Sequence, residues 1–386
     1  MNGNTAPRRA LASLILPPLI GVVVVVHGLI HLLGAVTGFG WAEVPALAGV
    51  TGGGGGLLWL GAALLVTAAG VGLLLRWRRW WLLGAAAAVA SQIAIVTDWS
   101  EAGAGTAVNA LLLLAVLHGW LAEGPRSMRV RYRRGAAEAL KGRQDDSRES
   151  GIVTEADLSD LPVQIATYLR RTGTLGKPHV TSFRAEIHGR IRSGPRAPWM
   201  TFTGEQVNTY SPAVSRHFTM DAAMAGLPVD VLHVLTDGRA TMQAEVCSAF
   251  PVARGAGPEM DRAETVTLFN DLCIMAPAAL IDAPVAWESV DAHCVRGTYT
   301  NGEHTVSAEL LFDDDGDLVD FVSDDRFAAD PGGKSFTRRR WSTPVGDYQL
   351  WHGRRLASRG SGVWHAPAPD GEFAYLEMTI ADVVTD

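Results

Sequence analysis

The sequence predicts a four-helix transmembrane domain followed by an α+β domain, an incomplete antiparallel β-barrel wrapped around two helices. Three observations lead to this fold class: apolar stretches early in the chain, hairpin signals in the rest, and a shift in charge between the two parts. Residues 1–150 hold 13 Lys and Arg against 8 Asp and Glu, whereas residues 151–386 hold 20 against 32. We therefore expect a span domain over 1–121, a charged linker over 122–157 and a β domain over 158–386.

Four apolar stretches are each long enough to cross a bilayer as a helix. They cover residues 17–37, 57–75, 80–97 and 105–121. A helix needs about 20 apolar residues to cross roughly 30 Å of hydrocarbon. The chain is therefore expected to be a multi-pass membrane protein.

Arginines set the expected orientation of these spans. They precede the first span, join the second to the third and follow the fourth, whereas the other two loops contain no Lys or Arg. By the positive-inside rule, the N-terminus and the C-terminal domain are cytoplasmic and the spans lie in the cell membrane. The arginines concerned are Arg8, Arg9, Arg76, Arg78, Arg79, Arg126, Arg129, Arg131, Arg133 and Arg134.

Polar side chains recur at one depth of the expected bundle. In "VVVVVHGLIHLLG", His27 and His31 are spaced i, i+4 on one helix face, and Gln92 and Asn109 fall near the level of His31. We expect these four side chains to form one intramembrane polar cluster. It is either a hydrogen-bonded clamp between helices or a site for haem, a metal, a quinone or protons. His27 and His31 are the candidate metal ligands, but the spans supply no third ligand.

Two helices are expected in the second part. "SDLPVQIATYLRRTG" predicts one near 160–171 that Ser159 or Asp160 can cap. "MDRAETVTLFNDLCIM" predicts another near 261–274, with Asp261 and Glu264 in capping-box spacing.

Nearly all of the remaining second part reads as β-strand. Five segments place a dipeptide ending in Gly between two β-rich runs, and Asp-Gly or Asn-Gly is the strongest short hairpin signal. In "EHTVSAELLF", apolar and polar residues alternate strictly, which predicts one buried face and one wet face. We therefore expect a curved meander that closes around the helices. The hairpin segments are "VLHVLTDGRATMQAEV", "RGTYTNGEHTVSAELLF", "LLFDDDGDLVDF", "DYQLWHGRRLAS" and "WHAPAPDGEFAYLEM".

No motif of established chemistry occurs in the chain. GxSxG, a phosphate-binding loop, a dinucleotide fingerprint after a strand and HExxH are all absent, which leaves enzymatic activity an open question that leans to none. A hydrolase that uses Asp261 or Asp347 ranks last among the alternatives, because no supporting group of residues accompanies them. The acidity of the second part argues against nucleic acid as a partner, because phosphate requires basic surfaces. Cys247, Cys273 and Cys294 show no metal or redox spacing and fit free thiols in a reducing compartment.

Four segments together carry a resemblance to a family. "DLPVQIATYLRRTG", "PWMTFTGEQ", "GPEMDRAETVTLFNDL" and "GDYQLWHGRRLASRGSGVW" resemble an uncharacterised bacterial family, a domain of unknown function, over about residue 158 to the C-terminus. Its sheet is similar to the half-barrel of bacterial lipoprotein carriers and lipid-binding lipoproteins. The resemblance implies an incomplete barrel with an apolar concavity able to hold acyl chains. Those carriers work outside the cytoplasmic membrane, whereas the arginines place this domain inside, and no lipobox cysteine is present.

Our leading hypothesis is a membrane-anchored protein whose cytosolic half-barrel binds a hydrophobic small molecule or a membrane lipid. It requires no cofactor. The alternative is a membrane redox, haem or quinone, or proton-handling protein centred on His27 and His31. The expected ligand-binding residues of the half-barrel are large aromatic side chains, Trp199, Phe202, Phe269, Trp341 and Trp364.

Overall fold

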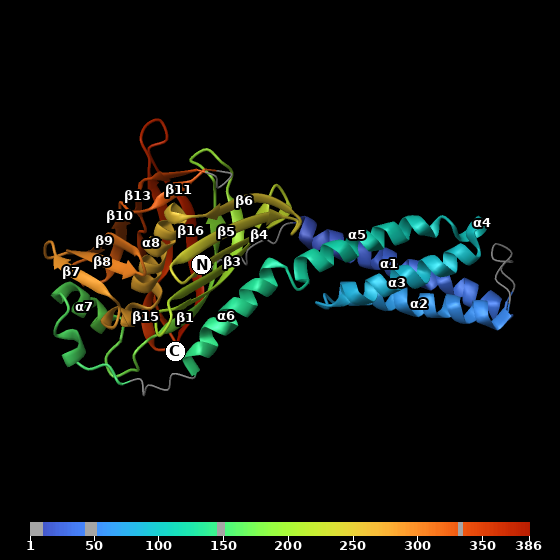
Figure 1. The fold of residues 1–386 in the computed structure, drawn as a ribbon, viewed down its shortest axis with the longest axis horizontal. Coiled ribbons are helices and arrows are strands. Elements are labelled where there is room, and N and C mark those ends of the chain that lie inside the picture. Colours follow the sequence, from blue (N-terminus) through green and yellow to red (C-terminus); the bar gives the residue numbers. More distant parts are fainter. Residues whose placement is uncertain (1–10, 43–51, 145–150, 331–334) are drawn as a thin grey trace, which may run out of the picture.

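The chain folds into a helical N-terminal region and a large antiparallel sheet domain (Figure 1). The computed structural model describes residues 11–42, 52–144, 151–330 and 335–386. Across these residues, four helices are long and apolar enough to cross a membrane. The coarse fold class predicted by the sequence, apolar helices followed by an open antiparallel sheet, is therefore confirmed.

The helical region is an antiparallel bundle. Its long helices are α1 (Leu11–Gly38), α2 (Gly52–Leu74), α3 (Trp80–Thr97) and α5 (Gly105–Glu123), and a single turn, α4 (Trp99–Ala102), precedes α5. The beginning of α1, the α2–α3 loop and the end of α5 lie at the end of the bundle nearest the sheet domain, which we call the sheet-proximal end (Figure 1). The opposite end, which carries α4, is the sheet-distal end.

Glycines allow α1 and α2 to approach each other closely. A Cβ atom added at Gly28 would collide with Thr67, and one added at Gly70 would lie 2.8 Å from Cγ2 and 2.9 Å from the backbone nitrogen of Val25. Small residues at such crossings let helix backbones pack tightly where water supplies no driving force.

The sheet domain is built on one fourteen-stranded antiparallel sheet and a small two-stranded sheet. The large sheet runs in the order β6-β5-β4-β3-β2-β1-β16-β15-β13-β10-β9-β8-β7, with β14 also paired to β15, and β11 pairs with β12. Its end strands β6 and β7 do not pair with each other, so the sheet is not closed into a barrel. The strands are β1 (Ser182–Ile191), β2 (Met200–Thr209), β3 (Ser215–Met224), β4 (Leu227–Thr236), β5 (Arg239–Val246), β6 (Phe250–Ala256), β7 (Val285–Ser289), β8 (Cys294–Asn301), β9 (His304–Phe312), β10 (Leu318–Ser323), β11 (Phe327–Ala329), β12 (Phe336–Arg338), β13 (Arg340–Ser342), β14 (Val345–Trp351), β15 (Arg354–His365) and β16 (Glu372–Thr385).

Helix α8 (Pro258–Met275) lies on one face of this sheet (Figure 1). It contacts β5 and β6 on one side and β9, β10 and β15 on the other, so strands far apart in the sheet share it as a core. The shorter α7 (Val163–Arg171) joins the same core through Ile165, Tyr168 and Leu169, which are completely buried.

The helix caps expected from the sequence are wrong. α7 begins after Pro162, and neither Ser159 nor Asp160 caps it. α8 begins after Gly257, three residues before the expected start, and Asp261 Oδ1 accepts a hydrogen bond of 2.6 Å from the backbone N–H of Ala240 instead of capping the helix. A carboxylate with a better donor in a neighbouring strand is not available to its own helix end.

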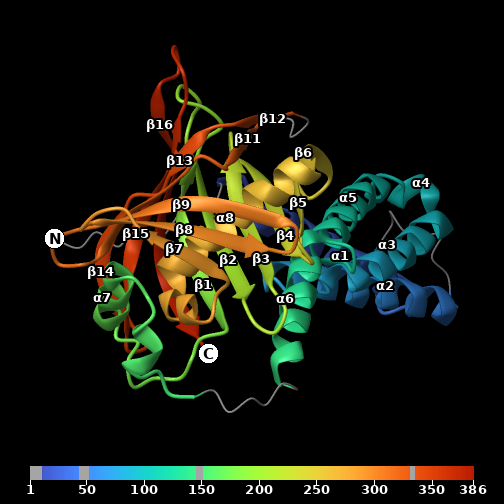
Figure 2. The ribbon, with the colours of Figure 1, turned by 60° about the vertical axis from the view of Figure 1, so that its left-hand side comes forward.

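The charged segment expected to be a linker over 122–157 contains a docked helix, α6 (Met128–Gln144). α6 packs on β2, β3 and β4, on the face opposite α8 (Figure 2). Met128, Tyr132 and Ala136 face the sheet and meet Val207 and Leu232. These three residues recur every four positions, so the sequence already carried the apolar stripe of an amphipathic helix between its arginines. The last residues of α6 are followed by 145–150, which lie outside the described part of the chain.

Candidate functional site

A chain of hydrogen bonds crosses the bundle near its sheet-distal end. His31 Nδ1 lies 2.9 Å from the backbone oxygen of His27, and His31 Nε2 lies 2.9 Å from Ser91 Oγ. Ser91 Oγ lies 2.9 Å from Asn109 Oδ1. Asn109 Nδ2 donates to Gln92 Oε1 at 2.9 Å, and Gln92 Nε2 donates to Thr106 Oγ1 at 3.1 Å. We call the side chains of these six residues the polar layer.

The polar layer brings together the four side chains that the sequence assigned to one cluster, His27, His31, Gln92 and Asn109. His31, Ser91 and Asn109 are at most 2% exposed. Ser91 and Thr106 are additional members, and each stands on the same helix, and close to the level, of an expected member. Depth along the helices, counted at 1.5 Å per residue, is the signal that locates them.

The second helix of the bundle contributes Trp59 to this level. Its ring centroid lies 5.3 Å from that of His31, Trp59 is 3% exposed, and its Nε1 has no hydrogen-bond partner. Every long helix of the bundle therefore contributes a polar or aromatic side chain at this level.

The polar layer offers a metal ion only two imidazoles. The rings of His27 and His31 are 4.6 Å apart at an interplanar angle of 86°, and their Nε2 atoms are directed to Ser91 and Asn109. In the described part of the chain, no three His, Cys, Asp or Glu side chains are grouped to hold a metal ion. Structural metal sites need about four such ligands.

The bundle is apolar between the polar layer and its sheet-proximal end. There, buried side chains from all four long helices pack together, including Val24 one turn below His27. Water and ions have no polar path through such packing. The polar layer is thus sealed on the sheet-proximal side by Val24, Val66, Ala69, Leu73, Trp80, Ala87, Ala88 and Leu112.

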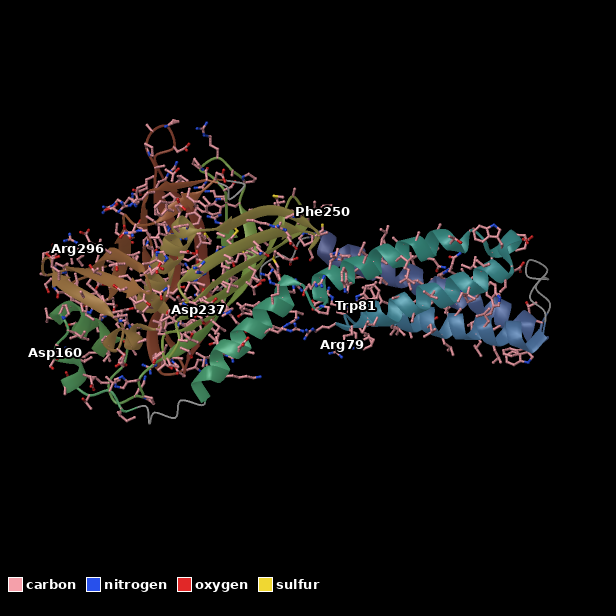
Figure 3. The ribbon with its side chains drawn as sticks, viewed as in Figure 1. Arg79, Trp81, Asp160, Asp237, Phe250 and Arg296 are labelled. Atoms are coloured by element: carbon pink, nitrogen blue, oxygen red, sulfur yellow. The ribbon has the colours of Figure 1, made fainter. Side chains whose placement is uncertain are left out.

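The sheet domain meets the bundle through two hairpin ends. His118 Nδ1 of α5 lies 3.2 Å from the backbone oxygen of Cys247 in the β5–β6 turn, and β4 contacts α1. Exposed apolar side chains lie on these hairpins, and Figure 3 shows one of them, Phe250, at the end of the sheet that points to the bundle. We call this set the hairpin tips: Met224, Leu227, Phe250 and Val252, which are 40%, 46%, 68% and 44% exposed.

Arg129 of α6 ties the bundle to the hairpins. Its guanidinium lies 3.1 Å from Glu123 of α5, 3.0 Å from Asp221 of β3 and 3.7 Å from Asp230 of β4. Ser248 in the β5–β6 turn donates a hydrogen bond to Asp230. Burial raises the pKa of Asp230 above its usual range, and these two partners only partly offset it. The contact between the bundle and the hairpins is therefore held by the ion pairs of Arg129 as well as by the contact of His118 with a backbone oxygen.

The five aromatic residues expected to line a ligand cavity occupy three different places. Phe269 and Trp341 are 0% and 3% exposed, and both pack against Phe321 with their ring centroids 5.4 and 6.2 Å from its own. Phe202 is buried in the same core. The structure thus brings these three residues into the packing around α8.

The other two aromatic residues lie nearer the surface. Trp199 contacts both Arg190 and Arg192, whose guanidinium carbons lie 4.6 and 4.4 Å from its ring centroid. Trp364 stacks on Tyr375 at 5.4 Å. A groove of about 920 Å³ crosses β1, β14, β15 and β16. A second groove of about 320 Å³ lies beside the docked part of α6, between this helix and β1, β2 and β16. None of the five aromatic residues lines either groove.

A buried ion cluster joins α8 to the sheet. Arg216 of β3 bridges Glu264 at 3.0 Å and Asp271 at 2.7 Å, and all three side chains are at most 7% exposed. Gln206 and Asn208 of β2 donate to the same Asp271 oxygen at 2.6 and 3.2 Å. Sequence reasoning missed this cluster and assigned Glu264 to a helix cap. The available signal was the spacing of seven between Glu264 and Asp271, which places both carboxylates on one helix face.

The charges of this cluster hold one another ionised. Burial raises the pKa of Glu264, but Arg216, His233 and Arg326 outweigh burial and hold that pKa well below its usual range. Burial likewise lowers the pKa of Arg216, and Asp271 and Glu264 together raise it above the ordinary value. Several donors satisfy the carboxylate oxygens of Glu264 and Asp271, so the cluster fixes α8 to the sheet.

The sheet domain matches one protein family along nearly its whole length. The profile of the family of unknown function DUF6544 matches residues 151–378. The chain belongs to the DUF6544 family. The resemblance expected from the sequence is thereby confirmed.

Three solved structures are similar to this chain. One is a putative outer membrane lipoprotein-sorting protein domain from Vibrio parahaemolyticus, 9% identical, covering 53% of this chain and 86% of its own, with a TM-score of 0.31. A DUF1329 family protein from Desulfovibrio piger is 11% identical over 58% of this chain and 92% of its own, with a TM-score of 0.35. A β-barrel-like DUF1849 protein from Brucella abortus is 9% identical over 54% and 99%, with a TM-score of 0.23. No curated protein matches the chain.

The DUF6544 match divides the functional features of the chain. The ion cluster, the five aromatic residues and the hairpin tips lie inside the matched range, whereas the polar layer and α6 precede it. The DUF6544 region therefore carries the hairpins that contact the bundle, and the bundle carries the polar layer.

Proposed function

We propose that this DUF6544 protein is a cell-membrane protein whose cytoplasmic sheet domain binds a hydrophobic ligand, a lipid of the adjacent leaflet. The observation that carries the proposal is the position of the hairpin tips. The hairpin tips expose apolar surface beside the ends of α1 and α5, both long enough to cross a membrane. At this level of a membrane, headgroups and acyl chains meet.

The arginines support a cytoplasmic position for the sheet domain. Arg76, Arg78 and Arg79 join α2 to α3, and Figure 3 places Arg79 at the sheet-proximal end of the bundle. Arg76, Arg79 and Arg126 form no ion pair with any described residue and remain exposed. Unpaired cations at one end of a bundle favour the cytoplasmic side and anionic headgroups.

Packing within the sheet domain favours the hairpin tips over the concavity as the lipid contact. In the lipid-carrier interpretation, Phe269 and Trp341 line a cavity. Both are instead enclosed by Phe321, Tyr299 and the strands around α8. A core packed in this way has no room for an acyl chain unless α8 leaves it.

The test uses tryptophan as a depth reporter in the full-length protein, reconstituted in nanodiscs with lipids brominated on their acyl chains. Bromine quenches tryptophan only in contact. We expect the additional fluorescence of Phe250→Trp to be quenched, and that of the matched control Val290→Trp to be unaffected, because Val290 is 45% exposed at the far edge of the sheet. Equal fluorescence of the 250 reporter in brominated and plain nanodiscs would reject the proposal.

The second candidate function is proton handling or redox chemistry centred on the polar layer. It is favoured by one observation: both ring nitrogens of the buried His31 have hydrogen-bond partners in the apolar bundle. Full-length protein without a visible chromophore, bound metal or extractable quinone would remove the haem and quinone versions. Proton uptake that is unchanged in the double variant His27→Leu, His31→Leu would remove the proton version.

A further inference from the structure

We propose that the polar layer is a binding site for one proton, taken up on His31, and that uptake reverses the hydrogen bonds of Ser91, Asn109 and Gln92. The inference rests on the second candidate function. It starts from a count of hydrogens between the six side chains.

His31 faces an acceptor on each side. The backbone oxygen of His27, 2.9 Å from Nδ1, can only accept, so Nδ1 must carry a hydrogen. A neutral imidazole has a single N–H. Nε2 of neutral His31 must then accept, and Ser91, 2.9 Å away, has to donate its hydroxyl hydrogen to it.

Ser91 has no second hydrogen for its other neighbour. Asn109 Oδ1 lies 2.9 Å from Ser91 Oγ and is turned to it, because Asn109 Nδ2 donates to Gln92 Oε1. With His31 neutral and the amides in this orientation, two oxygen atoms meet at hydrogen-bond distance with no hydrogen between them. A buried contact of this kind is unfavourable.

One proton on His31 supplies the missing hydrogen. The imidazolium donates from Nδ1 to His27 and from Nε2 to Ser91, which leaves the hydroxyl free to donate to Asn109 Oδ1. His27 Nε2, 3.3 Å from Asn109 Oδ1, donates to the same oxygen. Every contact in the layer then has one donor and one acceptor.

Rotation of both amides satisfies the neutral form equally well. Asn109 Nδ2 then donates to Ser91 and His27, Gln92 Nε2 donates to Asn109, and the hydroxyl of Thr106 donates to Gln92. The oxygen and nitrogen of an amide are nearly equal in shape, so both orientations fit the same space. The layer therefore has two complete hydrogen-bond patterns that differ by one proton.

Among the described residues, no acidic side chain faces His31, so hydrogen-bond acceptors alone hold its imidazolium. The groups that face it are His27 on α1, Trp59 on α2, Ser91 on α3 and Asn109 on α5, and none of them is an acid. The indole of Trp59 lies 5.3 Å from the His31 ring, centroid to centroid, at an interplanar angle of 47°.

Apolar packing closes both sides of the layer. Buried side chains around Val24 lie towards the sheet-proximal end, and Ala35 and Ala94 lie towards the sheet-distal end. Gln92 and Thr106 are only half-buried.

The test is solid-state NMR of the full-length protein, labelled with ¹⁵N-histidine and reconstituted in nanodiscs, between about pH 8 and about pH 5. We expect one buried histidine to gain a second ring N–H as the pH falls. The signal should disappear in His31→Gln and persist in His118→Gln, the matched control on the exposed face of α5. Ser91→Ala, which is close in size, should also lose the charged form because it removes the acceptor at Nε2.

A polar layer whose histidines stay neutral over the whole range in folded protein would overturn the inference. A titrating signal that belongs to His27 would also overturn it while leaving proton handling intact. Reversal is checked separately by the side-chain amide signals of Asn109 and Gln92: if these stay fixed while His31 takes up its proton, the coupling is refuted.

Discussion

The bundle and the sheet domain each bury a polar cluster, but they do so in opposite ways. The polar layer joins imidazole, hydroxyl and amide groups and includes no Asp, Glu, Lys or Arg side chain, and the ion cluster consists of a guanidinium held between two carboxylates. A charge in hydrocarbon is more expensive than a hydrogen-bonded neutral group, so the bundle uses imidazole, hydroxyl and amide. The sheet domain can bury ions because Gln206, Asn208 and Arg326 supply further donors around them.

The difference teaches how each region should respond to loss of one member. Removal of one ion from the ion cluster leaves its partners charged and buried. Removal of one side chain from the polar layer leaves only a donor or acceptor without a hydrogen-bond partner.

Arg216→Met should lower the free energy of unfolding of the sheet domain by about 3–5 kcal/mol, because Glu264 and Asp271 lose their shared counter-ion. Chemical denaturation of the full chain in detergent, followed by circular dichroism in the β region, measures the change. Adding Glu264→Gln and Asp271→Asn to the same chain should recover part of it.

The matched control is Arg190→Met. Arg190 makes a two-point ion pair with Glu377, but their side chains are 48% and 39% exposed, so its loss should cost no more than about 1 kcal/mol. Equal losses for both arginines would break the comparison between buried and exposed charge.

Gly135→Ala tests the junction between the two regions. A Cβ at Gly135 would lie 2.5 Å from Nε2 and 2.7 Å from Cδ2 of the buried His217, so α6 should be pushed from the sheet at a cost of about 1–3 kcal/mol. Hydrogen exchange of the α6 backbone measures the loss. Alanine normally favours a helix over glycine by about 1 kcal/mol, so slower exchange in the variant would contradict the docked position of α6. Gly61→Ala, at a helical glycine with open space around it, should leave α6 unchanged.

Asp320 is a half-buried carboxyl whose burial outweighs the opposing charges of His365 and Arg340. It should therefore make the domain less stable as the pH rises. Burial raises the pKa of Asp320 to about 6. Between about pH 4, the ordinary value, and pH 6 the folded chain holds a proton that the unfolded chain releases, so the stability is lost as pH rises through 6. Asp320→Asn should therefore stabilise the domain by about 1–2 kcal/mol at pH 7.5 and by almost nothing at pH 4. The measurement is denaturant unfolding at both pH values.

Asp324→Asn is the control for this pH effect, because the Asp324 side chain is 66% exposed on the next turn of the chain. It should change the unfolding free energy by less than about 0.5 kcal/mol at either pH. A stabilisation by Asp320→Asn that is the same at pH 4 and pH 7.5 would show that ionisation is not its cause.

Ser91→Ala should have the smallest effect of the four. Hydrogen bonds between membrane helices contribute about 0.6 kcal/mol on average, because the unfolded helices also find partners. Equilibrium unfolding of the bundle in mixed micelles should show a loss of this size, with Thr97→Ala, whose hydroxyl bonds within its own helix, as the control. A loss of 3 kcal/mol or more, as in the ion cluster, would end the distinction between the two regions.

The polar layer was accessible to sequence reasoning because depth in a bundle is a local property. A constant rise per residue converts the distance from the span end into a level, so His31, Gln92 and Asn109 could be matched before any packing was known. Rotation about the helix axis is not fixed in this way. Trp59 therefore lies beside His31, although its place near a span end made it equally suited to the membrane surface.

The interior of the sheet domain was much less accessible. Aromatic residues of the same type line cavities and fill cores, and the choice depends on what packs against them. Here Phe269 and Trp341 pack against Phe321 in the core around α8. Trp199 instead contacts two arginines near the surface. The ion cluster joins residues 48 and 55 positions apart, beyond any local pattern.

The sequence by itself determined the elements: four apolar helices from stretches of sufficient length, and hairpins from alternation and Gly-containing turns. These follow from chain periodicity and backbone sterics, which act over a few residues. Only the tertiary structure decided that α6 docks on the sheet, that α8 fills the concavity and that Glu264 pairs with Arg216. Each of those outcomes depends on which surfaces meet after folding, and the gain from burying them is not written in any one segment of the chain.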